Sequence, residues 1–216
     1  VLCFRTRFMT YTMQHKLTTE FIGTFFLSLT VCTAAVYGSA GDYAPFAIAS
    51  ALMVMIYAGG HISGAHYNPA VTVSVYLRGA CDKDDVLPYI ASQIVAAVSA
   101  ALIVERLLFP DAPTPEMFEL GTEAVVAELL FTFALAYVIL NVATTESTSG
   151  NGYYGAAIAL VVLAGAMTVG SISLGSFNPA VTSALIVSGK VSLADSWMHF
   201  APQFIGAVLA TYVYKF

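Results

Sequence analysis

Long apolar stretches alternate with short segments rich in polar residues, glycine and proline along most of this chain. Each stretch approaches the length that a helix needs to cross the hydrocarbon core of a bilayer, and no segment between them is large enough to be a domain. We predict six membrane-spanning helices, at residues 17–38, 45–60, 86–108, 122–143, 153–170 and 194–215. The pattern therefore predicts an all-α, multi-pass membrane protein.

Two shorter apolar runs follow the second and the fifth spans. Each begins with Asn-Pro-Ala, at Asn68, Pro69 and Ala70 and again at Asn178, Pro179 and Ala180. Asparagine is a favourable N-cap, and proline suits the first helical position because its missing N–H costs nothing there. The apolar run of about eight residues gives a helix of about 12 Å, too short to cross a bilayer. We therefore predict re-entrant half-helices at 68–77 and 178–187, whose irregular approaches must be packed in protein or line a wet cavity.

The two halves of the chain repeat. Glu20 and Gln93 of the first half correspond to Glu128 and Gln203 of the second, and the two Asn-Pro-Ala boxes lie 110 positions apart. Each half holds three spans and one half-helix, so the second half enters the membrane from the opposite side and the halves form an inverted repeat. We place the first repeat at 17–108 and the second at 122–216, joined by an extracellular loop at 109–121.

The distribution of lysine and arginine predicts the orientation. If the N-terminal segment 1–16 is cytoplasmic, Arg106 and Lys190 are external, and the other six basic residues are cytoplasmic: Arg5, Arg7, Lys16, Arg78, Lys83 and Lys215. This excess follows the positive-inside rule and predicts a cytoplasmic N-terminus. The protein is expected in a plasma or cell membrane.

Composition excludes several classes of function. The chain is 58% hydrophobic and only 10% charged, with a mean hydropathy of +0.80, which excludes an ordinary soluble domain. It has no basic patch, so nucleic acid is not an expected partner. Cys3, Cys32 and Cys81 lack metal-ligand spacing, so neither a metal nor another cofactor is expected. No grouping of nucleophile and base supports an enzyme.

The two half-helices are predicted to meet with their N-termini near the middle of the membrane. Each N-terminus carries about half a positive charge, which repels cations. Asn68 and Asn178 each offer an amide N–H to passing water, which interrupts a proton-conducting chain of water molecules. Carbonyl groups before each box are expected to line the pore. The expected pore-lining residues are Gly60, His61, Ser63, Gly64 and His66 before the first box and Ser173, Leu174 and Ser176 before the second.

The paired Asn-Pro-Ala boxes, the Gly-His-Ile-Ser-Gly-Ala-His approach at 60–66 and the repeated Glu and Gln residues resemble the aquaporin, or major intrinsic protein, family. The resemblance covers about residues 17–215. It implies six helices with two half-helices, a pore in every subunit and a homotetramer in the lipid bilayer. By register with the family, the outer constriction falls on Ile48, Ala166, Gly175 and Val181.

At this constriction the chain departs from the family pattern. Many members carry arginine directly after the second box, where this chain has Val181, and the aspartate of glycerol facilitators is also missing. Arginine offers hydrogen bonds that replace lost hydration and adds a positive barrier. Without it, we expect a broader pore for water and small uncharged solutes such as glycerol, urea, ammonia or hydrogen peroxide. A narrowed or closed pore is a third outcome.

Polar residues in the apolar segments leave alternatives open. Glu20 and Glu128 are expected to accept hydrogen bonds from the loops that lead to the half-helices, but they suit a proton-coupled secondary transporter as well. His61 and His66 are expected to line the pore or pack the loop, with pH gating as the alternative. Their counterparts Ser171 and Ser176 are not metal ligands, which argues against a metal site repeated in both halves.

Overall fold

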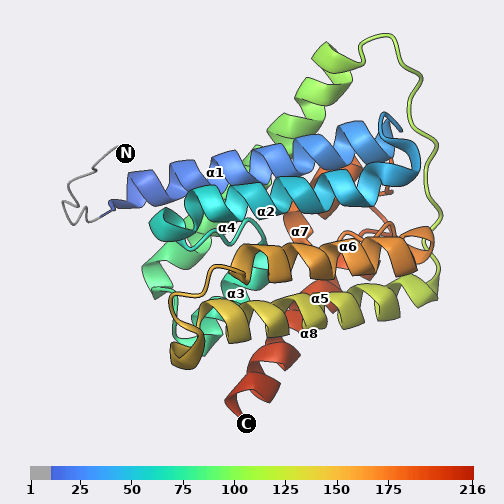
Figure 1. The fold of residues 1–216 in the computed structure, drawn as a ribbon. Helices are drawn as coiled ribbons and strands as arrows, with labels where there is room; N and C mark the ends of the chain where they lie inside the picture. The colour runs from blue at the N-terminus through green and yellow to red at the C-terminus, as the bar shows by residue number, and fades with distance from the viewer. Residues whose placement is uncertain (1–10) are drawn as a thin grey trace.

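The computed structural model describes residues 11–216, so the expectations for Cys3, Arg5 and Arg7 lie outside the described residues. Eight α-helices make up this part of the chain (Figure 1). They are α1 Met13–Thr30, α2 Ala44–Ser63, α3 Pro69–Arg78, α4 Lys83–Ile103, α5 Thr122–Ala143, α6 Tyr154–Ser173, α7 Pro179–Val187 and α8 Trp197–Lys215. The π-helical segments Val31–Val36 and Val104–Leu108 extend α1 and α4.

The predicted spans differ from the helices mainly at their ends. Helix α1 begins at Met13 rather than at residue 17, because Thr12 and His15 form a capping box that starts the helix earlier. Helices α2 and α6 continue three residues beyond the predicted ends at 60 and 170. Both stop at a residue with left-handed backbone geometry, Gly64 (φ 88°) and Leu174 (φ 64°).

Five of the long helices are long and apolar enough to cross a membrane: those spanning Met13–Val36, Gly41–Ser63, Lys83–Leu108, Thr122–Ala143 and Tyr154–Ser173. Helix α8 is not among these five. It carries His199 and Gln203, whose side chains are completely buried in the protein. Its polar residues therefore face the interior of the bundle. A search by hydropathy alone therefore misses a membrane-spanning helix whose polar side chains are buried within the protein.

The two halves pack in the same way and then interlock. Helix α1 packs against α2 and α4, and α5 packs against α6 and α8. Each half-helix also contacts the last helix of the other half, α3 with α8 and α7 with α4. Helix α8 approaches α5 so closely that a Cβ atom at Gly206 would overlap the Leu129 carbonyl group. Segment 109–121 crosses one end of the bundle between α4 and α5 (Figure 1).

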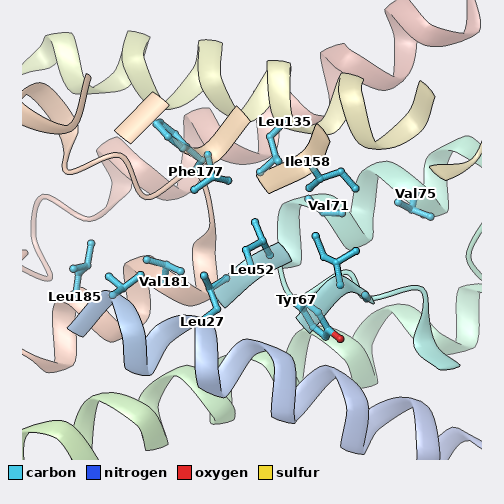
Figure 2. Close-up of a cluster of buried hydrophobic side chains, with 14 of the residues drawn as sticks. Leu27, Leu52, Tyr67, Val71, Val75, Leu135, Ile158, Phe177, Val181 and Leu185 are labelled. Carbon is cyan, nitrogen blue, oxygen red and sulfur yellow. The ribbon is translucent and has the colours of Figure 1, made fainter. Parts of the chain in front are cut away.

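The centre of the bundle is apolar, but it is not filled. Figure 2 shows side chains from both halves around this centre, including Leu27, Leu52, Leu135, Ile158 and Val181. Each of these five residues is less than 9% exposed, and each also lines an internal cavity. Large apolar side chains on the outside, such as Leu87, Leu130 and Met167, are in contrast more than half exposed. An outer surface of this composition suits contact with lipid.

Candidate functional site

The two Asn-Pro-Ala boxes meet in the middle of the protein. The side-chain oxygen of Asn68 accepts hydrogen bonds from the backbone N–H groups of Ala70 (2.9 Å) and Val71 (3.3 Å) and so caps α3. The side-chain oxygen of Asn178 accepts from the Ala180 N–H (2.9 Å) and caps α7. Because both half-helices begin here, their positive ends lie at the same place.

The two boxes are also bonded to each other. The amide nitrogen of Asn68 donates to the carbonyl oxygen of Phe177 (2.9 Å), and that of Asn178 donates to the carbonyl oxygen of Tyr67 (2.9 Å). An amide NH₂ group has two hydrogens, so each asparagine keeps one donor beyond this bond. Both asparagines line the cavity, where that second hydrogen can meet a passing solute.

Glu20 holds the approach to α3. Its carboxylate accepts hydrogen bonds from the Ser63 hydroxyl (2.6 Å) and the His66 N–H (2.9 Å), and also from the Tyr67 N–H (2.7 Å) and the Gln93 amide (2.8 Å). The Glu20 side chain is completely buried. The irregular loop therefore finds its acceptors within the protein, as the interior of a membrane protein requires.

Glu128 repeats this arrangement in the second half. It accepts from the Ser173 hydroxyl (2.7 Å), the Ser176 N–H (3.0 Å), the Phe177 N–H (2.7 Å) and the Gln203 amide (2.7 Å), and it is also completely buried. The partners match those of Glu20 position by position. The inverted repeat predicted from the sequence thus extends to individual hydrogen bonds.

Tyr67 and Phe177 fix the backbone on which the asparagines depend. Both adopt left-handed geometry with φ of 49°, an unusual conformation for a bulky residue, and both are almost completely buried. The Tyr67 ring fills the space left by Gly23 and Gly59, and the Phe177 ring fills the space beside Gly165. A Cβ atom at any of these glycines would overlap the ring, so the glycines form sockets for the two loops.

A cavity of about 820 Å³ passes the paired asparagines. At one end its lining includes Val36 and Lys190, near the ends of α1 and α7. At the other end the lining includes Arg78, which ends α3, and Asn151, which follows α5. The half-helices meet between these ends, so the cavity follows a path from one end of the bundle to the other.

Comparison with known proteins agrees with this geometry. The chain matches the family described as Major intrinsic protein over residues 7–166 and again over residues 151–216. It is 34% identical to Probable aquaporin NIP4-2 of Arabidopsis thaliana, over 94% of this chain and 75% of that protein. It is also 34% identical to Aquaporin NIP1-4 of Oryza sativa subsp. japonica, over 96% of this chain and 78% of that protein. The chain belongs to the major intrinsic protein family.

A solved structure shares the fold. The aquaglyceroporin from Plasmodium falciparum superposes with a TM-score of 0.76 at 22% sequence identity, covering 94% of this chain and 96% of that one. Together with the apolar helices, membership of the major intrinsic protein family identifies an integral, multi-pass membrane protein. It also excludes an enzyme, because the curated relatives are aquaporins.

The positions assigned by register with the major intrinsic protein family all belong to the cavity wall. Ile48, Ala166, Gly175 and Val181 all line the cavity, on α2, on α6, in the approach to α7 and on α7. Val181 is only 4% exposed. None of the four has a charged or hydrogen-bonding side chain, so these positions are apolar apart from their backbone groups.

The predicted pore-lining residues of this family member divide into two groups. Gly60, His61, Gly64, His66, Leu174 and Ser176 line the cavity, but Ser63 and Ser173 do not. These two serines lie in the last turns of α2 and α6, and their hydroxyl groups donate to Glu20 and Glu128. The approaches are also shorter than predicted, because the Gly60 carbonyl accepts the Gly64 N–H and the Gly170 carbonyl accepts the Leu174 N–H.

Each half has a buried histidine whose ring lies beside a threonine hydroxyl group. Aligning the two halves of the sequence did not reveal this shared feature. His66 is buried with its ring Nδ1 3.2 Å from the Thr72 hydroxyl, and His199 places its Nδ1 3.2 Å from the Thr182 hydroxyl. His199 corresponds by sequence to Tyr89, whose ring contacts that of His66 edge to face. An imidazole thus comes from a loop in one half and from α8 in the other. Among the described residues, no group of three or more His, Cys, Asp or Glu could hold a metal ion.

Proposed function

We propose that this chain is a passive channel for water and for small uncharged solutes such as glycerol, urea, ammonia or hydrogen peroxide. The observation that carries the proposal is a single cavity that passes the paired Asn68 and Asn178 amides and extends to both ends of the bundle. The relatives, which are named aquaporins and an aquaglyceroporin, support the same class of solute.

The facing half-helices supply the barrier to cations. In aquaporin-type pores generally, the positive ends of half-helices oppose the entry of cations and protons into a low-dielectric path. Here the Asn68 and Asn178 oxygens are occupied by their own caps, so the amide groups present only a donor to the lumen. A water molecule that accepts both donors has no lone pair left to accept a hydrogen bond from a neighbouring water molecule, so it can only donate in both directions, which interrupts proton transfer.

We attribute the broad range of permeating solutes to an apolar ring formed by Ile48, Ala166, Gly175 and Val181. A permeating molecule loses part of its hydration there and finds no charged donor to replace it. That loss costs more for a strongly hydrated molecule than for one that carries an apolar edge. We therefore assign these four positions as the selectivity constriction, with a preference for neutral solutes beyond water alone.

The test is a panel of solutes in liposomes containing the purified protein, with flux followed by stopped flow. Native protein should pass water and several of the neutral solutes with low activation energy and without saturation. Val181→Arg should reduce solute permeability more than water permeability, and Val181→Met separates narrowing from charge. If the native protein passes water but excludes every neutral solute in the panel, the proposed broad solute selectivity is contradicted.

We further propose a homotetramer in the plasma membrane with a cytoplasmic N-terminus. The exposed apolar side chains on the outer helices support contacts with lipid and with neighbouring subunits. Cross-linking in mild detergent should give species up to the tetramer. A membrane-impermeant maleimide should label Asp111→Cys in intact cells but label Asp84→Cys only after permeabilisation, and the reverse pattern would overturn the orientation.

A further inference from the structure

Lys190 stands at the outer end of the cavity without a carboxylate partner. It is one of the residues that line the cavity, and the other charged groups in the lining, Arg78 and Glu146, lie at the opposite end. Within residues 11–216, no carboxylate oxygen lies within 4.0 Å of its ammonium group. Its positive charge is therefore not neutralised by direct pairing.

The backbone around Lys190 is fixed. The Lys190 N–H donates to the Leu185 carbonyl (2.9 Å), which closes the C-terminal end of α7. Gly189 precedes it with φ of 74°, a left-handed conformation that turns the chain out of the helix. The next residue, Val191, is 1% exposed in the apolar core.

The connecting segment holds the side chain as well. The Lys190 ammonium donates to the backbone carbonyl of Glu116 (2.9 Å), and the Phe118 N–H donates to the Lys190 carbonyl (2.9 Å). An ammonium group has three N–H donors, so two remain for water in the vestibule. The carbonyl bond restrains the charge without cancelling it.

We propose that Lys190 is a specificity-determining residue that excludes cations at the outer mouth, as a displaced substitute for the arginine that this chain lacks at Val181. The proposal deepens the channel function above and rests on it. Helix α7 separates the mouth from the central asparagines by about 13 Å, so the charge of Lys190 acts before a solute reaches the constriction. Being outside the ring, it repels cations without narrowing the path for neutral solutes.

The expected effect follows from the charge. One unit charge about 6 Å from an ion in water changes the local ion concentration about threefold. Lys190→Gln should therefore raise potassium leak about threefold at low salt, and Lys190→Glu about tenfold, because reversal changes the charge by two units. Raising the salt to about 1 M shortens the screening length to about 3 Å and should remove most of both effects.

The experiment measures potassium flux and water flux on the same proteoliposomes. Lys190→Arg should retain the native leak, and Arg106→Gln is the matched control, because Arg106 lies on the same side but pairs with Glu105 at 3.5 Å and lines a separate cavity. If Lys190→Glu leaks no more potassium than native protein at low salt while water flux is retained, the inference is overturned.

A second measurement needs no variant, in case the substitutions impair folding. In native protein, potassium flux should rise with ionic strength more steeply than in proportion to concentration, because screening lifts the mouth barrier. Potassium flux strictly proportional to concentration overturns the inference. Absent water flux in the native protein would instead refute the proposed channel itself.

Discussion

Replacing Glu20 by glutamine tests whether the buried carboxylates hold the pore together or couple transport to protons. In the native protein, both oxygens of Glu20 are acceptors, and each has two donors. Glutamine keeps the shape but turns one oxygen into an NH₂ group. Either way round, that group faces a backbone N–H, of His66 or of Tyr67, which then loses its acceptor.

The magnitude follows from the bonds that change. A buried N–H without an acceptor costs about 1–3 kcal/mol, and hydrogen bonds to a neutral amide are about 1 kcal/mol weaker than those to a carboxylate. Removal of a buried charge offsets part of this loss. We expect Glu20→Gln to lower the free energy of unfolding by about 2–4 kcal/mol, a large share of the 5–15 kcal/mol that is typical of folded proteins. Glu128→Gln should cost the same within about 1 kcal/mol, because its four bonds match.

The assay is thermal unfolding in detergent together with the yield of folded protein, followed by water permeability normalised to that yield. Glu119→Gln is the control, because Glu119 is an exposed carboxylate in the connecting segment. The two buried variants should lose stability and yield, while the channels that do fold keep their selectivity.

The opposite result would refute this reasoning. If Glu20→Gln folds with native stability, its hydrogen bonds do not hold the loop. If the same variant also abolishes a dependence of solute uptake on a pH gradient, the carboxylate couples transport to protons, and the protein is a secondary transporter rather than a passive pore.

Three further predictions concern other parts of the molecule. Asn68→Asp keeps the helix cap but removes the donor to the facing loop and adds a negative charge at the centre, so proton leak in dye-loaded vesicles should rise. Unchanged leak would contradict the central barrier. Gly23→Ala, which places a methyl group against the Tyr67 ring, should cost about 1–3 kcal/mol in thermal unfolding, whereas Gly170→Ala, with no atom within 4 Å, should not destabilise. Burial first, and nearby carboxylates second, raise the pKa of Cys81 to about 11. Its alkylation, with the N-terminal cysteine replaced, should therefore be slow at neutral pH and rise about tenfold per pH unit, and a rate independent of pH would contradict this.

The starts of the half-helices could be predicted because their signals are local. An asparagine cap followed by proline is readable within three residues, and the structure begins α3 at Pro69 and α7 at Pro179. The end of α6 is not readable in the same way. Leu174 adopts left-handed geometry without being glycine, so the sequence gives no signal that α6 stops there.

The contacts across the centre needed the fold. The Asn68 amide bonds to the Phe177 carbonyl, 109 residues away, and only the inversion of the second half brings the two loops together. Sequence comparison could pair Glu20 with Glu128 by offset, but an offset does not say which donors surround a carboxylate. His199 was missed because its counterpart in the first half is a tyrosine, so the repeat concealed the shared role of the imidazole rings.

The hydrogen bonds at the centre explain why selectivity in this fold can vary without loss of structure. Glu20, Glu128 and the two asparagine caps are committed to the half-helices, and each takes its partners from residues that are buried. Changes there cost stability before they alter permeation. Val181 lines the cavity and takes no part in these bonds, so a different side chain at this position would leave them in place. Lys190, farther along the same cavity, can supply the positive charge that the constriction lacks. Electrostatic repulsion acts over a Debye length of about 10 Å, so the charge need not lie in the constriction itself. Selection by size, in contrast, requires direct contact between the solute and the constriction. Under these two proposals, size selection and charge selection reside on different residues of one pore.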